Sequence, residues 1–267
     1  MPRIQFIEVH EQPWFPKTLR SEVTDVLQFG SEAAKTYSSI APVLGRALAA
    51  SGSRSVVDLC SGSGGPWLDL SQRLDADTAG IHVLLTDKFP VAAGQGNLKT
   101  SSANGVQFYE KPVDAKQVPA ELTGFRTMFT SFHHFPPAEA RAILQNAVDA
   151  GQGIGIFEVT RRSGFAIAMM FPWSLSPLVF TPFLRPFRWS RLLWTYMLPV
   201  IPLVLLFDGI VSCLRSYRPR ELREMVKGLA GPKYHWEIGE QAGTKGGPPI
   251  TFLVGYPDGR RLTKEQL

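Results

Sequence analysis

Short apolar runs alternate with segments of helical spacing through the first 160 residues. Runs near 55–60, 81–86, 106–110, 126–131 and 153–159 are typical of buried strands. Apolar residues at helical spacing, with proline or serine at the start or glycine after the end, predict the helices between them. These helices are expected over 21–29, 31–50, 66–74, 90–102 and 137–150. Such alternation predicts parallel strands joined by helical crossovers.

Roughly the last 50 residues predict one more helix and then two consecutive strands with no helix between them. Residues 217–229 read as an amphipathic helix with a proline near its start. Two apolar stretches, 234–239 and 250–256, read as the final strands, with a glycine-rich connection between them. We therefore expect a single α/β sheet with seven strands.

A glycine-rich turn follows the first strand. The strand carries Asp58 near its end, and Gly62 and Gly64 then allow positive φ and close approach of a ligand to the main chain. Pro66 suits the first turn of the next helix, whose free N–H groups would face an anionic group. Asp87 ends the second strand and could accept hydrogen bonds from ribose hydroxyls. Together these features predict a nucleotide site.

At these residues the sequence resembles the class I S-adenosylmethionine-dependent methyltransferases. Their first motif stands here as Asp58-x-Cys60-x-Gly62-x-Gly64, with Cys60 where the family usually has glycine. Asp87 matches the acid that binds ribose in that family, and Asp114 begins a match to the motif that contacts adenine. Residues 127–135 resemble the family's fourth strand and the loop after it.

The resemblance implies a doubly wound, mostly parallel seven-stranded sheet, which is the Rossmann-like methyltransferase fold, with an antiparallel closing hairpin. It also implies S-adenosyl-L-methionine as the methyl donor. The residues then expected to bind this cofactor are Asp58, Cys60, Ser61, Gly62, Gly64, Asp87, Lys88, Asp114, Ala115 and Ser131.

Two histidines follow the fourth strand. Because imidazole titrates near neutral pH, His133 or His134 is the expected general base if the acceptor must lose a proton. The alternative is that they only orient the loop. Glu158, at the end of strand five, either contacts substrate or pairs with Arg161 or Arg162. No wider cluster of ligands surrounds the two histidines, so no metal site is expected.

Residues 163–207 form a hydrophobic insertion after strand five. Residues 163–184 and 192–207 carry no charge, and three arginines lie between them, namely Arg185, Arg188 and Arg191. Prolines interrupt both apolar pieces, which favours broken helices over a pair of membrane-spanning helices. Three interpretations stay open: a lid over an apolar substrate pocket, a homodimer face, or a surface that lies on a membrane. The arginines would then contact lipid phosphates or lie in a solvated loop.

Composition narrows the class of protein. The 267 residues are 44% hydrophobic, which suits a packed core, and the formal charge of +5 is scattered, so nucleic-acid binding is not indicated. Only two cysteines and no apolar leader favour a reducing, cytoplasmic location, with membrane association left open. The expected segments are 1–52 (N-terminal helices), 53–160 (cofactor core), 161–214 (insertion) and 215–267 (closing strands).

Two other classes of glycine-containing motif are each excluded by one residue. Trp67 stands where a dinucleotide fingerprint needs its third glycine, and Ser61 stands where a hydrolase elbow needs glycine. The sequence therefore predicts a methyltransferase acting on a small, hydrophobic or lipid-like acceptor. The alternative is a non-catalytic protein of the same fold, serving as a membrane-associated or scaffolding partner.

Overall fold

The computed structural model describes residues 1–62, 64–74, 80–90, 105–231 and 233–257. These residues fall into two compact units. The helical unit comprises 1–35 and 160–218, and the sheet unit comprises 36–159 together with the chain from Pro219 onward. The expected N-terminal segment, 1–52, is thus divided between the two units. Each unit is described by itself.

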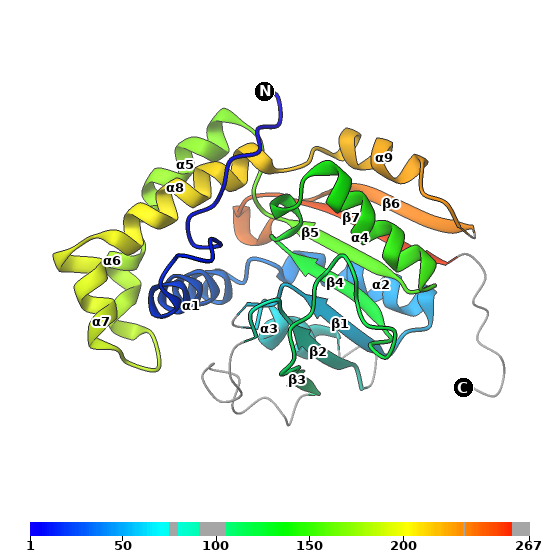
Figure 1. Cartoon of the computed structure of the whole chain (residues 1–267), viewed down its shortest axis with the longest axis horizontal. Coiled ribbons are helices and arrows are strands. Elements are labelled where there is room, and N and C mark those ends of the chain that lie inside the picture. The colour runs from blue at the N-terminus through cyan, green and yellow to red at the C-terminus, as the bar shows by residue number, and fades with distance from the viewer. Residues whose placement is uncertain (63, 75–79, 91–104, 232, 258–267) are drawn as a thin grey trace. The chain divides into compact units, whose positions relative to one another are not determined.

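The sheet unit is built on seven strands in the order β3-β2-β1-β4-β5-β7-β6 (Figure 1). The strands are β1 (Ser55–Leu59), β2 (His82–Thr86), β3 (Val106–Phe108), β4 (Phe125–Phe129), β5 (Ile154–Glu158), β6 (Tyr234–Gln241) and β7 (Ile250–Pro257). The first five are parallel, and β7 is antiparallel to both β5 and β6. The predicted mostly parallel seven-stranded sheet with a closing hairpin is confirmed.

The helices of the sheet unit begin and end where local chemistry permits. They are η1 (Ser38–Ile40), α2 (Ala41–Ser51), α3 (Trp67–Leu74), η3 (Phe132–His134), α4 (Pro137–Asp149), α9 (Pro219–Lys227) and the short turn η6 (Thr244–Gly246). Gly52 ends α2 with φ 65°, as a left-handed cap requires. In α4 the buried side chains of Ala140, Ile143, Leu144 and Ala147 follow helical spacing.

One predicted helix, 31–50, is wrong in its first half. The first helix of the chain, α1 (Lys17–Ala33), begins earlier than expected and runs through Ser31, whereas α2 begins only at Ala41. Pro42 lies in the first turn of α2, a position that proline favours. Ser31, the predicted start, lies inside α1 and is not the N-cap of a helix. The helix expected over 90–102 lies outside the described residues, apart from its first residue.

The helical unit contains the insertion after strand five. Its helices besides α1 are α5 (Gly164–Ser174), α6 (Pro177–Phe180), η4 (Thr181–Phe183), α7 (Trp189–Leu192), the π-helical η5 (Leu193–Met197) and α8 (Val200–Arg215). Helix α5 packs along α8, and α1 contacts both α6 and α8 (Figure 1). A hydrophobic core joins α1 to α8 through Leu19, Val23, Ile201 and Leu205. The prediction of broken helices is confirmed.

Two of the insertion's three arginines are engaged inside the helical unit. Arg191 is buried, and its Nη2 lies 2.6 Å from Oδ2 of Asp25 on α1. Arg188 donates to the hydroxyl of Ser21 at 3.1 Å and lies 3.9 Å from the same carboxylate of Asp25. The prediction that Arg191 lies in a solvated loop or contacts lipid phosphates is therefore wrong. Arg185, by contrast, is exposed.

By length and composition, the 20-residue stretch Gly164–Phe183 is apolar enough to cross a membrane. The pair formed by Trp189–Met197 and Val200–Arg215 passes the same test but bends by 73° at its break. A core helix of a soluble protein can satisfy these criteria too, so they do not by themselves identify a span.

Candidate cofactor site

The turn between β1 and α3 is held in backbone conformations that favour glycine. Gly62, Gly64 and Gly65 have φ values of 54°, 128° and 58°. Cys60 also lies in the left-handed region, with φ 58°, so the family's usual glycine at this position has a conformational reason. A side chain there costs about 1 kcal/mol of strain. Cysteine nevertheless adopts this conformation here.

The carboxylate of Asp87 fastens this loop to the end of β2. Its Oδ2 accepts a hydrogen bond from the Gly62 N–H at 2.9 Å, and its Oδ1 accepts one from the Phe89 N–H at 2.8 Å. Burial raises the pKa of Asp87, although backbone hydrogen bonds, including those from Phe89 and Gly62, and the charge of His134 lower it. Each carboxylate oxygen keeps capacity for a second donor. Asp87 can therefore hold the loop and still accept bonds from a ligand's hydroxyl groups.

A second set of hydrogen bonds joins Ser61 to the same strand. The Ser61 N–H donates to the carbonyl of Thr86 at 3.0 Å, and the Thr86 N–H donates to the Ser61 hydroxyl at 3.2 Å. The Ser61 and Thr86 hydroxyls both donate to the main-chain carbonyl of Asp58, at 2.9 and 2.8 Å. The loop is thus attached at both its start and its middle.

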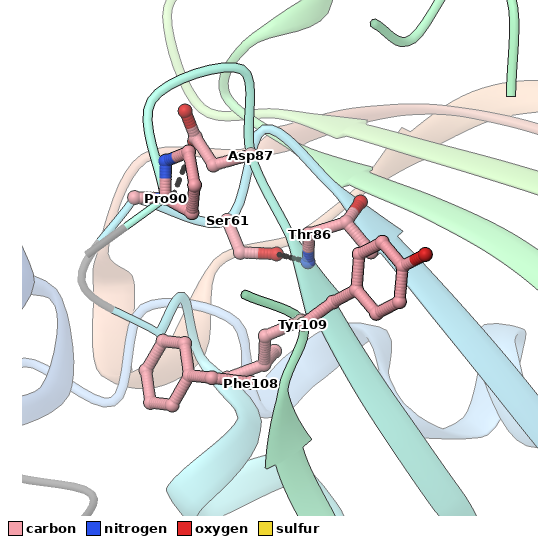
Figure 2. Close-up of a pocket in the computed structure, with 8 residues that line it drawn as sticks. Ser61, Thr86, Asp87, Pro90, Phe108 and Tyr109 are labelled. Atoms are coloured by element: carbon pink, nitrogen blue, oxygen red, sulfur yellow. Dashed lines mark hydrogen bonds between the residues drawn. The ribbon is translucent and has the colours of Figure 1, made fainter. Parts of the chain in front are cut away.

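A small hollow opens at the carboxyl ends of β1, β2 and β3 (Figure 2). It is lined by Ser61, Gly62, Leu85, Thr86, Asp87, Pro90, Phe108 and Tyr109. Three of these, Ser61, Gly62 and Asp87, were predicted from sequence. The rings of Phe108 and Tyr109 leave the end of β3 on opposite sides in Figure 2. Sequence reasoning missed these two aromatic residues, although a position at the end of a parallel strand was a usable signal.

Asp58 lies behind the loop. It is buried, its Oδ1 accepts a hydrogen bond from the Thr127 hydroxyl at 2.6 Å, and it does not line the hollow. Burial raises the pKa of Asp58 to about 7, although hydrogen bonds including that of Thr127 lower it. The position is typical of a residue that supports the loop from the side of the core. Direct contact between Asp58 and a cofactor stays a prediction.

The predicted adenine motif lies beside Asp87. The Val113 N–H donates to the main-chain carbonyl of Asp87 at 2.9 Å, which places Asp114 and Ala115 next to the ribose-binding candidate. The Asp114 carboxylate accepts a hydrogen bond from the Lys116 N–H at 2.9 Å, and Ala115 is buried. Lys88, also predicted, is exposed.

The two histidines lie in η3, directly after β4. Nδ1 of His133 is 2.7 Å from Oε2 of Glu158, and both side chains are buried. Oε1 of Glu158 also accepts the Phe132 N–H at 2.7 Å. The ring of His134 meets that of His133 edge to face, with centroids 4.3 Å apart. Ser131, before this turn, is buried, and its hydroxyl has no hydrogen-bond partner among the described residues.

Glu158 stays ionised in this arrangement. Burial alone would raise its pKa, but the charges of His133 and His134 and the hydrogen bonds from His133 and Phe132 lower it. An ionised carboxylate accepts hydrogen bonds only, so Nδ1 of His133 donates to Glu158 whether the ring is charged or neutral. In the neutral ring Nε2 is then the nitrogen without a proton. This pairing of His133 with Glu158 was not expected from sequence.

Tyr37 belongs to the core of the sheet unit. Its hydroxyl is hydrogen-bonded to the Thr130 hydroxyl, and its ring packs edge to face on Phe129 at 5.1 Å. The Thr130 hydroxyl also accepts the Val159 N–H at 3.1 Å. Through Thr130, Tyr37 therefore links the ends of β4 and β5, close to the turn that carries the histidines.

The raised pKa of Asp58 predicts a pH dependence of stability. Because the folded state binds this proton more tightly than the unfolded chain, Asp58 lowers the free energy of unfolding progressively as pH rises from 3.8 to about 7. Asp58→Asn keeps the side chain's shape without the titration. Urea unfolding at several pH values should show that the free energy of unfolding of Asp58→Asn rises relative to that of wild type as pH increases across that interval. Asp149→Asn, at an exposed carboxylate of α4, is the matched control. If the difference in free energy of unfolding between Asp58→Asn and wild type did not change with pH, the raised pKa of Asp58 would be contradicted.

Comparisons with known proteins bear on the fold. No protein-family model matches the sequence, and no curated protein matches it either. Among solved structures, the plantazolicin methyltransferase BpumL in complex with SAH is 10% identical; the match covers 94% of this chain and 95% of that chain, with a TM-score of 0.58.

Two further structures match less closely. The O-methyltransferase NcsB1 from neocarzinostatin biosynthesis, in complex with S-adenosylmethionine and 2-hydroxy-5-methyl naphthoic acid, is 14% identical over 90% of this chain and 58% of that chain, with a TM-score of 0.52. A structure from Rhodobacter sphaeroides, assigned by its name to the Zn-dependent alcohol dehydrogenases, is 11% identical over 90% of this chain and 98% of that chain, with a TM-score of 0.51. At these identities the likeness concerns the fold alone. The chain has the Rossmann-like fold of the class I methyltransferases, with a helical insertion after strand five.

Proposed function

We propose that this protein is an S-adenosylmethionine-dependent methyltransferase whose acceptor is a small, hydrophobic or lipid-like molecule. The observation that carries the proposal is the bond from the Gly62 N–H to the Asp87 carboxylate, which places a glycine-rich loop and an acid at one edge of the sheet. Ligands of doubly wound sheets bind at that edge. Two of the matched structures contain this donor or its product SAH.

The residues present fit such a cofactor. The main chain at Gly62 and Gly64 would take its amino-acid end, and Asp87 would accept hydrogen bonds from its ribose hydroxyls. The buried Ser131 hydroxyl offers a further hydrogen-bonding group near the histidines. A dinucleotide cofactor fits less well, because the fully buried Trp67 stands where the dinucleotide fingerprint needs glycine.

In the bound state the cofactor would supply an electrophilic methyl group on its sulfonium sulfur. The protein would align the acceptor for in-line displacement and exclude water. Where the acceptor carries a proton, Nε2 of His133 would take it, and the Glu158 carboxylate would hold the imidazole in the required tautomer and stabilise the imidazolium. His134, half-buried beside it, is the second candidate for this role.

Cofactor affinity tests the central assignment. Isothermal titration calorimetry should show that S-adenosylmethionine and S-adenosylhomocysteine bind wild type, and that Asp87→Ala weakens both about 10- to 100-fold, because a charged hydrogen-bond acceptor is lost. Asp149→Ala, on the exposed face of α4, should bind like wild type. Unchanged affinity in Asp87→Ala would refute the proposed site. If wild type binds neither compound but still associates with membranes, the non-catalytic alternative holds.

The acceptor class has its own experiment. A donor labelled in the transferred methyl group is offered with small phenolic acids, with a long-chain lipid, and with RNA or protein. We expect label in the apolar small molecules, since the insertion is rich in exposed apolar side chains. Turnover confined to the polar macromolecules would show that the acceptor proposal is wrong while leaving the methyltransferase proposal intact.

The proposed base can be separated from a structural role. With an active acceptor, His133→Gln should lower kcat by about 100-fold or more with little change in donor affinity, since general bases contribute that much. Glu158→Gln should lower kcat less and alter its pH profile, because Nδ1 loses its charged partner. A loss in His134→Gln but not in His133→Gln would transfer the role to His134. Wild-type kcat in both variants would exclude a histidine base.

A further inference from the structure

The helical unit exposes many large apolar side chains between residues 164 and 207. Phe165, Trp189 and Met197 are 77%, 78% and 78% exposed. Phe183 and Leu203 are also mostly exposed. A folded chain in water rarely leaves so many large apolar groups uncovered within so short a segment. We call the exposed apolar side chains of 164–207 the apolar face.

Helix α5 shows most clearly how exposed this face is. Apolar residues surround it on all sides, as is typical of a helix buried in a core or in a membrane. Yet only 17% of the most apolar 18-residue window in Gly164–Phe183 is buried. Phe165, Ala168, Met169 and Pro172, at helical spacing, are all exposed and form one row along the helix.

The second half of the insertion repeats this arrangement. On α7 and η5, Trp189, Leu193 and Met197 recur every four residues and are exposed. On α8, Leu203 and Phe207 are exposed with the same spacing. Each helix thus has a row of exposed apolar side chains, while Ile201, Val204 and Leu205 of α8 are buried in the core with α1.

The charges of the helical unit indicate which kind of surface can bind the apolar face. No aspartate or glutamate occurs between residues 159 and 207. Two acids of the unit are held inside it: Asp25 is ion-paired with Arg191 at 2.6 Å, and Asp208 is hydrogen-bonded to Nδ1 of His10 at 2.7 Å. Arg185, in the middle of the insertion, remains exposed. The face therefore combines apolar side chains with positive charge and no carboxylate of its own.

We propose that the apolar face docks on the surface of an anionic lipid bilayer. Exposed phenylalanine, leucine and methionine side chains would enter the boundary between headgroups and acyl chains, where tryptophan is also favoured, and Arg185 would meet the lipid phosphates. We place the helices in the interface and not across it, because α5 ends at Ser174 after 11 residues, fewer than the roughly 20 that a membrane-spanning helix needs, and the η5–α8 junction bends by 73°. This proposal is independent of methyl transfer.

Vesicle flotation with the full-length protein tests the apolar part. Wild type should float with vesicles made of equal parts phosphatidylcholine and phosphatidylglycerol. The double variant Phe165→Ser and Trp189→Ser should partition about tenfold or more weakly, since both side chains lose apolar contact with lipid. Because these side chains are exposed, the fold should persist, which circular dichroism checks. Trp14→Ser, a tryptophan 67% exposed outside this segment, is the matched control and should float like wild type.

A charge-reversal pair tests the electrostatic part. Arg185→Glu and Arg220→Glu change the net charge equally, but Arg220 is an exposed residue of α9, outside the helical unit. Arg185→Glu should weaken binding about fivefold or more relative to Arg220→Glu, because each basic residue at an anionic surface contributes a factor of that order. Vesicles of phosphatidylcholine alone should bind wild type more weakly.

Three results would overturn the proposal. The first is absence of wild type from the floated anionic vesicles. The second is a double variant that partitions as strongly as wild type, or Arg185→Glu that binds as Arg220→Glu does. The third is a stable dimer in analytical ultracentrifugation that the double variant dissociates, with no vesicle binding, which would assign the face to a second copy of the chain.

Discussion

The site depends on one hydrogen bond between parts of the chain 25 residues apart, from the Gly62 N–H to the Asp87 carboxylate. The loop after β1 contains several residues at positive φ and so cannot continue either the strand or the helix beside it. It needs partners outside itself, and β2 supplies them through Asp87 and Thr86. The parallel register of β1 and β2, with Leu59 opposite Thr86, brings those partners within reach.

Burial by itself raises the pKa of Asp58, Asp87 and Glu158 around this edge, and the neighbouring charges decide the outcome. Asp58 has few charged neighbours that favour ionisation, and burial raises its pKa to about 7. Glu158 is equally buried, but the charges of the two histidines lower its pKa. Groups of one chemical type whose environments separate their pKa values are suited to separate roles. In the proposed function, Asp58 would support the loop, Asp87 would face the cofactor, and Glu158 would orient the base.

Local sequence signals predicted the strands, the loop and the acid at the end of β2, because each depends on residues close together in the chain. One local signal was misread, since α2 starts at Ala41, where Pro42 fits the first turn, and not at Ser31. Tertiary contacts decided the rest. The pair His133 and Glu158 forms only because β4 and β5 are neighbours in register. Likewise, the role of Arg191 follows from the packing of α7 near α1, which no spacing along the chain shows.

A crystal structure of the protein with S-adenosylhomocysteine tests the central claim most directly. The account predicts that the ribose hydroxyls lie within hydrogen-bond distance of the Asp87 carboxylate, with the amino-acid end of the ligand against the main chain of Gly62 and Gly64. It also predicts that the sulfur faces the turn that carries His133. A ligand bound elsewhere on the chain, or a ribose turned away from Asp87, would contradict it.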